Sequence, residues 1–269
     1  MKKIFLLTLV SLFVISTNLL AKDVSAYLVG SYMDVNSATS KLEKAGFKVV
    51  AEYESVKDGT TVIFTNDALI SQASKPGRAH AAVLRLFVDK KEKMISFTNP
   101  VYFGKAFMQD EYDATVFDAQ LASINGAFSG LKDSVDKLDA DDIGGFHFMM
   151  GMPYYEDADS LGEGSNSELL AKAKNYKKGK FFLFELKLSD NSVLVGYDLG
   201  KRTKKFVKKI GRANGAVLPY CISIEDGKAT SLEAKYYLAV SYPLLSMTEF
   251  TTIATVPGAI KKDLAKPFK

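Results

Sequence analysis

An internal repeat is the feature that most constrains how this chain folds. The segment Gly77–Leu84 recurs as Gly211–Leu218, with six of eight positions identical and an offset of 134 residues. Two weaker repeats keep the same order along the chain: Ala122–Phe128 with Ala254–Ile260, and Tyr27–Gly30 with Phe148–Gly151. Self-similarity of this kind is typical of a duplicated structural unit. The sequence therefore predicts two copies of one domain.

Each copy has the same predicted order of elements, β-α-β-β-α-β-β-α. In copy one we expect strands at Ala26–Ser31, Phe47–Tyr53, Thr60–Thr65, His80–Val88 and Met94–Thr98, and helices at Asp34–Ala45, just before Gly77 and at Tyr112–Leu131. In copy two we expect strands at Phe146–Met152, Phe181–Leu188, Val193–Tyr197, Ala216–Ile224 and Thr230–Leu238, and helices at Ser167–Tyr176, Gly200–Ile210 and Ser246–Leu264. This order predicts an α+β fold, with helices on one face of a mainly antiparallel sheet.

The chain of 269 residues is long enough for two domains of ordinary size. We expect the first repeat at residues 23–132 and the second at residues 145–269. Between them, residues 133–144 carry five aspartates and lead into Gly144-Gly145. Their spacing lacks the pattern and the central glycine of an EF-hand loop, so we expect a solvated acidic linker and not a calcium site.

The first 21 residues have the pattern of a signal peptide. Lys2 and Lys3 precede an apolar run that begins at Ile4, and polar residues then lead to Ala21. This pattern predicts cleavage after Ala21, with Ala26 as a second candidate. An uncleaved anchor is the alternative, but the run is short of the about 20 residues that cross a bilayer. We expect a soluble periplasmic protein without a transmembrane segment in the mature chain.

The charge balance excludes one class of partner. Without Lys2 and Lys3, the 35 basic residues become 33 against 31 acidic residues, which leaves a net charge of +2. Proteins that bind nucleic acid usually carry a strong basic excess, so we expect no nucleic-acid partner. The single cysteine, Cys221, cannot form an internal disulfide, and its apolar strand predicts a buried, inert thiol.

Short motifs near the strands add a family resemblance. Copy two carries Gly215–Pro219 before a strand and Asp226-Gly227 at a hairpin turn, and copy one ends its last strand in Thr98-Asn99-Pro100. With these motifs each copy resembles a domain of the domain of unknown function 302 family. The resemblance covers most of the mature chain and implies a small α+β fold, sometimes in tandem, with no known reaction. Copy one departs from it with Arg85 where copy two has Pro219, and copy two has no Asn-Pro after its last strand.

No catalytic signature or cofactor motif is present in the sequence. The two histidines, His80 and His147, have no histidine at the matching position of the other copy. No nucleophile elbow, phosphate-binding glycine loop or Cys-x-x-Cys motif occurs, and one cysteine is too few for covalent haem attachment. We therefore expect no catalytic residues and no cofactor, although a diverged active site between the repeats remains open as a weaker alternative.

A metal site is the second alternative. His147 and Met149 share one face of the strand expected at Phe146–Met152, and imidazole and thioether groups suit copper. Strand alternation would place Met150 on the other face, and methionine commonly fills irregular gaps in a core. We therefore expect no metal ligands, and keep a metal- or redox-handling protein that uses His147 and Met149 as the alternative.

Positive charge marks the candidate ligand-binding residues. Between Lys172 and Arg212 there are 13 basic and 3 acidic residues. We assign ligand binding to three lysines of the expected helix at Gly200–Ile210 and to the two repeated arginines: Lys201, Lys205, Lys208, Arg78 and Arg212. A solvated helix face and structural salt bridges would explain the same residues. The sequence thus predicts a non-catalytic protein that binds an anionic small molecule or a protein partner.

Overall fold

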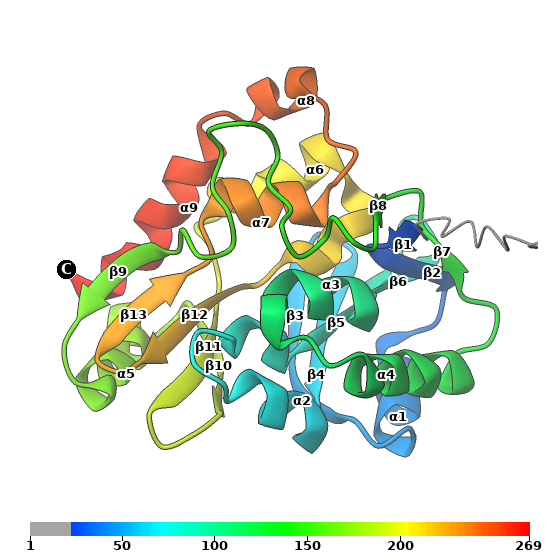
Figure 1. The fold of residues 1–269 in the computed structure, drawn as a ribbon, viewed down its shortest axis with the longest axis horizontal. Helices are drawn as coiled ribbons and strands as arrows, with labels where there is room; N and C mark the ends of the chain where they lie inside the picture. The colour runs from blue at the N-terminus through cyan, green and yellow to red at the C-terminus, as the bar shows by residue number, and fades with distance from the viewer. Residues whose placement is uncertain (1–22) are drawn as a thin grey trace, which may run out of the picture.

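Two antiparallel sheets, each built around a central apolar strand, organise residues 23–269, which the computed structural model describes (Figure 1). The predicted signal peptide, 1–21, lies outside the described residues. The first sheet has the order β3-β4-β5-β6-β2-β7, with β2 (Tyr27–Ser31), β3 (Lys48–Val56), β4 (Gly59–Thr65), β5 (Leu84–Asp89), β6 (Met94–Thr98) and β7 (Lys132–Asp133). The second has the order β10-β11-β12-β13-β9, with β9 (Asp159–Glu163), β10 (Phe182–Lys187), β11 (Ser192–Tyr197), β12 (Tyr220–Glu225) and β13 (Lys228–Ser231).

The two large sheets share one strand order. Taken in chain order from β2 and from β9, the first strand of each set lies beside the fifth, and the fourth strand lies between the third and the fifth. The α+β class and the antiparallel pairing are therefore confirmed. That the two halves arose as copies of one domain stays a prediction, which this shared order supports. We call the elements up to β7 the first half and those from β9 onward the second half.

Most helices begin at the polar residues that the sequence offers as caps. Asp34 accepts the backbone N–H of Ser37, and capping boxes form at Ser165 and Ser246. The α-helices are α1 (Val35–Lys44), α2 (Asp67–Ala73), α3 (Pro100–Met108), α4 (Ala114–Ala127), α5 (Asn166–Asn175), α6 (Val207–Ile210), α7 (Ala234–Ser241), α8 (Met247–Thr252) and α9 (Val256–Ala265). The 3₁₀ helices are η1 (Ala79–Ala82), η2 (Gln109–Glu111), η3 (Tyr176–Gly179), η4 (Thr203–Phe206), η5 (Arg212–Val217) and η6 (Lys266–Phe268).

The strand expected at Phe146–Met152 is wrong. These residues form an irregular loop, and β9 takes the place of the first strand in the second half. The loop packs its phenylalanines partly against the core without a sheet, and the Phe148 ring stacks on Phe250 of α8 with centroids 5.3 Å apart. Gly162, and not Gly151, therefore takes the position that Gly30 holds in the first half. Gly30 lies in β2, which pairs with β6, and Gly162 lies in β9, which pairs with β13.

Other expected strands of the second half are shorter than predicted. The first residues of the stretch Ala216–Ile224 belong to η5, and the later ones belong to β12. The stretch Thr230–Leu238 divides into β13 and α7. Glu233 causes the second change, because its carboxylate accepts the backbone N–H groups of Lys235 and Tyr236 and so caps α7. The helix expected at Ser246–Leu264 forms as two helices, α8 and α9.

In the first half, the expected strand His80–Val88 likewise begins as the 3₁₀ helix η1. The long helix expected at Tyr112–Leu131 is confirmed in shortened form as α4, but α3 was missed. Its signal lay in Asn99-Pro100, where Asn99 caps the helix by accepting the N–H of Val101 and Pro100 starts it.

The acidic stretch 133–144 is not an unpaired linker. Its residues take part in β7, which pairs with β2, and in β8 (Lys137–Asp139), which pairs with β1 (Asp23–Ser25). Ser25, 1% exposed, accepts the backbone N–H of Ser134, so this stretch is tied to the start of the described chain. The division into repeats at this stretch stays a prediction.

The halves meet through alternate residues of their central strands. On β5, Arg85 contacts Cys221 and Asp89 contacts Arg212, and Glu225 of β12 accepts the backbone N–H of Gly77. In return, η5 packs against β5 and β6, while η1 packs against β11 and β12. Helices α1 and α5 pack against the sheets of their own halves. Each half therefore covers part of the other half's sheet.

Candidate functional site

A basic groove lies between η4, α6 and the start of α9. It has a volume of about 570 Å³ and is lined by Arg202, Thr203, Lys205, Phe206, Lys209, Thr255, Val256 and Ala259. Three of these side chains are cationic, and none of the described acidic residues is in the lining. We call this hollow the basic groove.

The local sequence explains why the lysines and Arg202 face this groove. Phe206 and Val207 are 2% and 0% exposed and anchor the turn in the core. Residues three and four apart share one side of a helix, so Arg202, Lys205 and Lys209 form one row. Lys209 also donates to the carbonyl oxygen of Thr252 at 3.4 Å, which keeps it near α9.

The start of α9 adds to the positive potential of the basic groove. This helix has ten residues and begins at Val256, so the positive end of its dipole faces the groove. The nearest acid on α9, Asp263, is already engaged, because it accepts the N–H of Gly200 and the hydroxyl of Thr203 and pairs with Lys266. The groove therefore presents positive charge with little local compensation.

The predicted ligand-binding residues do not gather in one place. Of them, only Lys205 lines the basic groove, while Lys201 and Lys208 are exposed on the same segment but outside its lining. Arg212 forms a two-bond ion pair with Asp89, at 2.7 and 2.8 Å, and that carboxylate is fully buried. This repeated arginine joins the two halves by an ion pair.

Arg78 lies at a second hollow, which we call the inter-half cleft. Its volume is about 230 Å³, and residues of both halves line it: Gly77, Arg78, Ala79, His80, Tyr155, Glu156, Ala158, Ser223, Glu225, Thr230 and Leu232. Arg78 pairs with Asp110 at 2.9 Å and lies over the Tyr155 ring, 5.4 Å from its centroid. Tyr155 in turn donates to the carbonyl oxygen of Gly77 at 2.7 Å, so this wall of the cleft is held rigidly.

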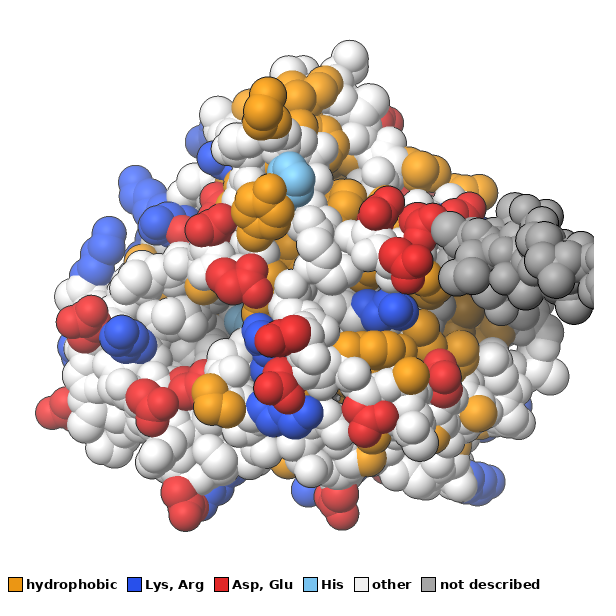
Figure 2. Space-filling view, viewed as in Figure 1, with side chains coloured by type: hydrophobic (Ala, Val, Ile, Leu, Met, Phe, Trp, Pro, Cys, Tyr) orange, Lys and Arg blue, Asp and Glu red, His pale blue; other side chains and the backbone are white. Residues whose placement is uncertain are grey.

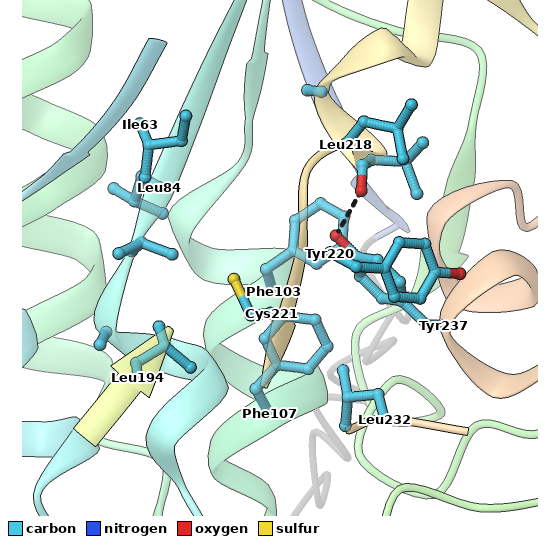
Figure 3. Close-up of a cluster of buried hydrophobic side chains, with 14 of the residues drawn as sticks. Ile63, Leu84, Phe103, Phe107, Leu194, Leu218, Tyr220, Cys221, Leu232 and Tyr237 are labelled. Carbon is cyan, nitrogen blue, oxygen red and sulfur yellow. Dashed lines mark hydrogen bonds between the residues drawn. The ribbon is translucent and has the colours of Figure 1, made fainter. Parts of the chain in front are cut away.

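A small cavity, the Arg85 cavity, lies deeper between the halves. It is lined by Arg85, His80, Phe107, Tyr220, Cys221, Leu232 and Tyr237, and its volume is about 10 Å³. Figure 3 shows Phe107, Tyr220, Cys221, Leu232 and Tyr237 gathered in this buried cluster. His80 and Leu232 line both hollows, so the Arg85 cavity adjoins the inter-half cleft.

Burial sets the protonation of the groups in this cavity. Burial, and next the nearby Arg85 charge, lower the pKa of His80 to about 3, so its imidazole is neutral at pH 7. Burial raises the pKa of the Cys221 thiol, against an opposing effect of Arg85. A nucleophilic cysteine needs the opposite shift. The prediction that Cys221 is buried is confirmed, at 5% exposed.

From the sequence alone, Arg85 stands out only because it departs from the pattern of the resembled family. It is 5% exposed and lies in the central strand of the first sheet. The signal was present, since Arg85 is the only charged residue between Ala81 and Val88. By sheet register it corresponds to Cys221 and not to Pro219, because two extra residues precede β12.

The alternative metal residues lie on a different surface. Apolar side chains gather on the surface around α8 (Figure 2). Met149 and Met150 of the neighbouring loop are 43% and 95% exposed, and the His147 ring lies against Tyr154 with centroids 4.3 Å apart. The loop is not a strand, so the alternation argument for separating these methionines is wrong. Within residues 23–269, no cluster of three or more His, Cys, Asp or Glu side chains has the arrangement of a metal site.

Comparisons with family models, curated proteins and solved structures found no match for this chain. The resemblance to the domain of unknown function 302 family therefore stays a prediction. Among the described residues, no helix combines the length and the apolar character needed to cross a membrane.

Proposed function

We propose that this protein is exported to the periplasm and binds a small multivalent anion in the basic groove, without catalysis. The observation that carries the proposal is the row Arg202, Lys205 and Lys209 in a lining without acids. Like charges held close together repel one another, and a bound anion relieves that repulsion. The volume of about 570 Å³ falls in the range usual for small-molecule sites.

A multivalent anion fits better than a monovalent one. Three cationic side chains and the dipole of α9 act on one hollow, and each favours negative charge. The hydroxyls of Thr203 and Thr255 can donate hydrogen bonds to phosphate or carboxylate oxygens. Phe206, which also lines the groove, gives a ligand an apolar floor.

Isothermal titration of the protein with tripolyphosphate at fixed ionic strength tests this proposal. Lys205→Glu should weaken binding by tenfold or more, since it reverses a charge in the lining; each tenfold corresponds to about 1.4 kcal/mol. Lys208→Glu is the matched control, because it makes the same change in net charge on the same segment but outside the lining. It should change the affinity by less than about threefold, as expected for an exposed charge pair.

Two results would contradict the proposal. The first is no measurable binding of tripolyphosphate to the unsubstituted protein. The second is an equal loss in Lys205→Glu and Lys208→Glu, which would show a diffuse electrostatic attraction instead of a site in the groove.

A further inference from the structure

Arg85 is buried, and its charge has no ion-pair partner among the described residues. Its Nη2 atom donates to the carbonyl oxygen of Pro219 at 3.4 Å and to Cys221 Sγ at 3.2 Å. Its Nε atom is buried and has no hydrogen-bond partner, and none of the described carboxylates forms an ion pair with this residue. Arginine stays protonated in proteins, so the charge cannot be removed by titration.

The same interface contains a partly buried arginine whose charge is paired. Arg212 donates hydrogen bonds to both carboxylate oxygens of Asp89 and also to the carbonyl oxygen of Lys57, the latter at 2.9 Å. Buried charges in proteins are normally paired in this way. Across from Arg85, in the matching strand position, the second half supplies only Cys221, whose thiol is neutral. The described residues therefore supply no negative partner for Arg85, and a small anion from solution could take that place.

The Arg85 cavity limits the size and the charge of such a partner. Its volume of about 10 Å³ leaves room for one small particle and excludes a polyatomic anion. One guanidinium balances one negative charge. The lining combines apolar Phe107 and Leu232 with the neutral imidazole of His80, which can donate one N–H. The inter-half cleft provides a path, since His80 and Leu232 line both hollows.

We infer that the Arg85 cavity binds a monovalent, monatomic anion of the size of chloride. Arg85 Nε–H and the imidazole N–H of His80 are the donors, and Phe107 and Leu232 exclude water from the pair. This site is separate from the basic groove, because the two share no lining residue.

Thermal unfolding of the whole mature protein, in sodium chloride and in sodium gluconate at the same ionic strength, tests this inference. Chloride should raise Tm by at least about 3 °C between 1 and 100 mM, because a ligand that binds only the folded state stabilises it. Gluconate is too large for the cavity. The Arg85→Met variant should lose the difference between the two salts. Lys91→Met is the control, since it removes an exposed positive charge and should keep the difference.

If Arg85→Met does not fold, a second measurement on the unsubstituted protein tests the anion site. Crystals of the unsubstituted protein grown in sodium bromide should show an anomalous peak within about 3.5 Å of Arg85 Nε, given the usual length of such contacts. Absence of that peak, or the same Tm for the unsubstituted protein in both salts, would show that the cavity holds water and not an anion. A salt response that survives in a folded Arg85→Met variant would also overturn the inference.

Discussion

Tyr102 and Tyr236 join the two halves by a pair of reciprocal hydrogen bonds. The Tyr102 hydroxyl donates to the carbonyl oxygen of Val240 at 2.9 Å, and the Tyr236 hydroxyl donates to that of Ala106 at 3.0 Å. Both donors are third in their helices, α3 and α7, and each acceptor lies four residues after the other donor. Such an exchange of roles is the mark of a two-fold interface between equivalent units. It supports a duplication with the same offset, 134 residues, as Arg78 and Arg212.

Removing either hydroxyl should destabilise the protein by the same amount. Tyr102→Phe and Tyr236→Phe should each lower the free energy of unfolding by about 1 kcal/mol, the net value of one buried hydrogen bond. Urea denaturation measures the difference. Tyr220→Phe is the control, because the Tyr220 hydroxyl is buried without a partner among the described residues and should be lost without cost. An equal loss in Tyr220→Phe would mean that these hydroxyls contribute through packing alone.

The two repeated arginines should differ in their contribution to stability. Arg212→Met leaves the buried carboxylate of Asp89 without its cationic partner, although the backbone N–H groups of Lys91 and Glu92 still donate to it, which should cost about 3 kcal/mol. Arg78→Met should cost about 1 kcal/mol, because its partner Asp110 is 85% exposed and only the contact with Tyr155 is shielded. Guanidinium denaturation of both variants checks the order. A larger loss for Arg78→Met would contradict the assignment of Arg212 as the interface ion pair.

Two aspartates should change the free energy of unfolding with pH in opposite directions. Burial raises the pKa of Asp136, so its ionisation disfavours the folded state above the unfolded pKa of about 3.8. Asp136→Asn should therefore stabilise the protein at pH 7 and match the unsubstituted protein at pH 3. Backbone and side-chain hydrogen bonds from Ser37 lower the pKa of Asp34, so its contribution is present above pH 3.8 and disappears as pH falls through the lowered value.

Asp34→Asn is thus the comparison of opposite sign, because asparagine keeps the helix cap and removes only the charge. It should be less stable than the unsubstituted protein at pH 7 and indistinguishable from it near pH 2. Unfolding by urea at pH 2, 3, 5 and 7 measures both variants. The same direction of change at pH 7 for the two substitutions would refute the assignment of the two environments.

Signal cleavage should occur after Ala21 and leave Lys22 as the mature N-terminus. Cleavage at the second candidate, after Ala26, would delete β1, whose residues pair with β8. It would also remove the carbonyl oxygen of Ser25, which accepts the side-chain N–H of Asn99 at 2.8 Å. N-terminal sequencing of the purified protein decides between the two. Recovery of Met1 from a membrane fraction would instead favour an uncleaved anchor.

Local sequence signals were sufficient for many elements. Asp34 marks the start of α1, and Ser165 and Ser246 form capping boxes with the glutamates three residues further on. Alternating or continuous apolar residues located β3, β4, β10 and β11 within a few residues. These signals are reliable because caps and periodic burial act within one element and need no knowledge of its neighbours.

The candidate sites were only partly within reach of the sequence. Basic composition pointed to the segment with Lys205, but the groove also needs Thr255 and Val256, about fifty residues further along the chain. The Arg85 cavity combines side chains from η1, β5, α3, β12 and α7. Whether a charge is paired depends on such distant neighbours, and for this reason Arg78 and Arg212 look alike in sequence and differ in the structure.

The sequence by itself determined the α+β class, the antiparallel pairing and the start of most helices, since these follow from patterns a few residues long. Tertiary structure decided that Phe146–Met152 is a loop, because Phe148 finds its apolar partner in Phe250 of α8 instead of in a sheet. It also decided that Arg85 is buried without a carboxylate while Arg212 has one. Burial and charge pairing across two sheets are set by contacts between residues more than a hundred positions apart, which no local pattern encodes.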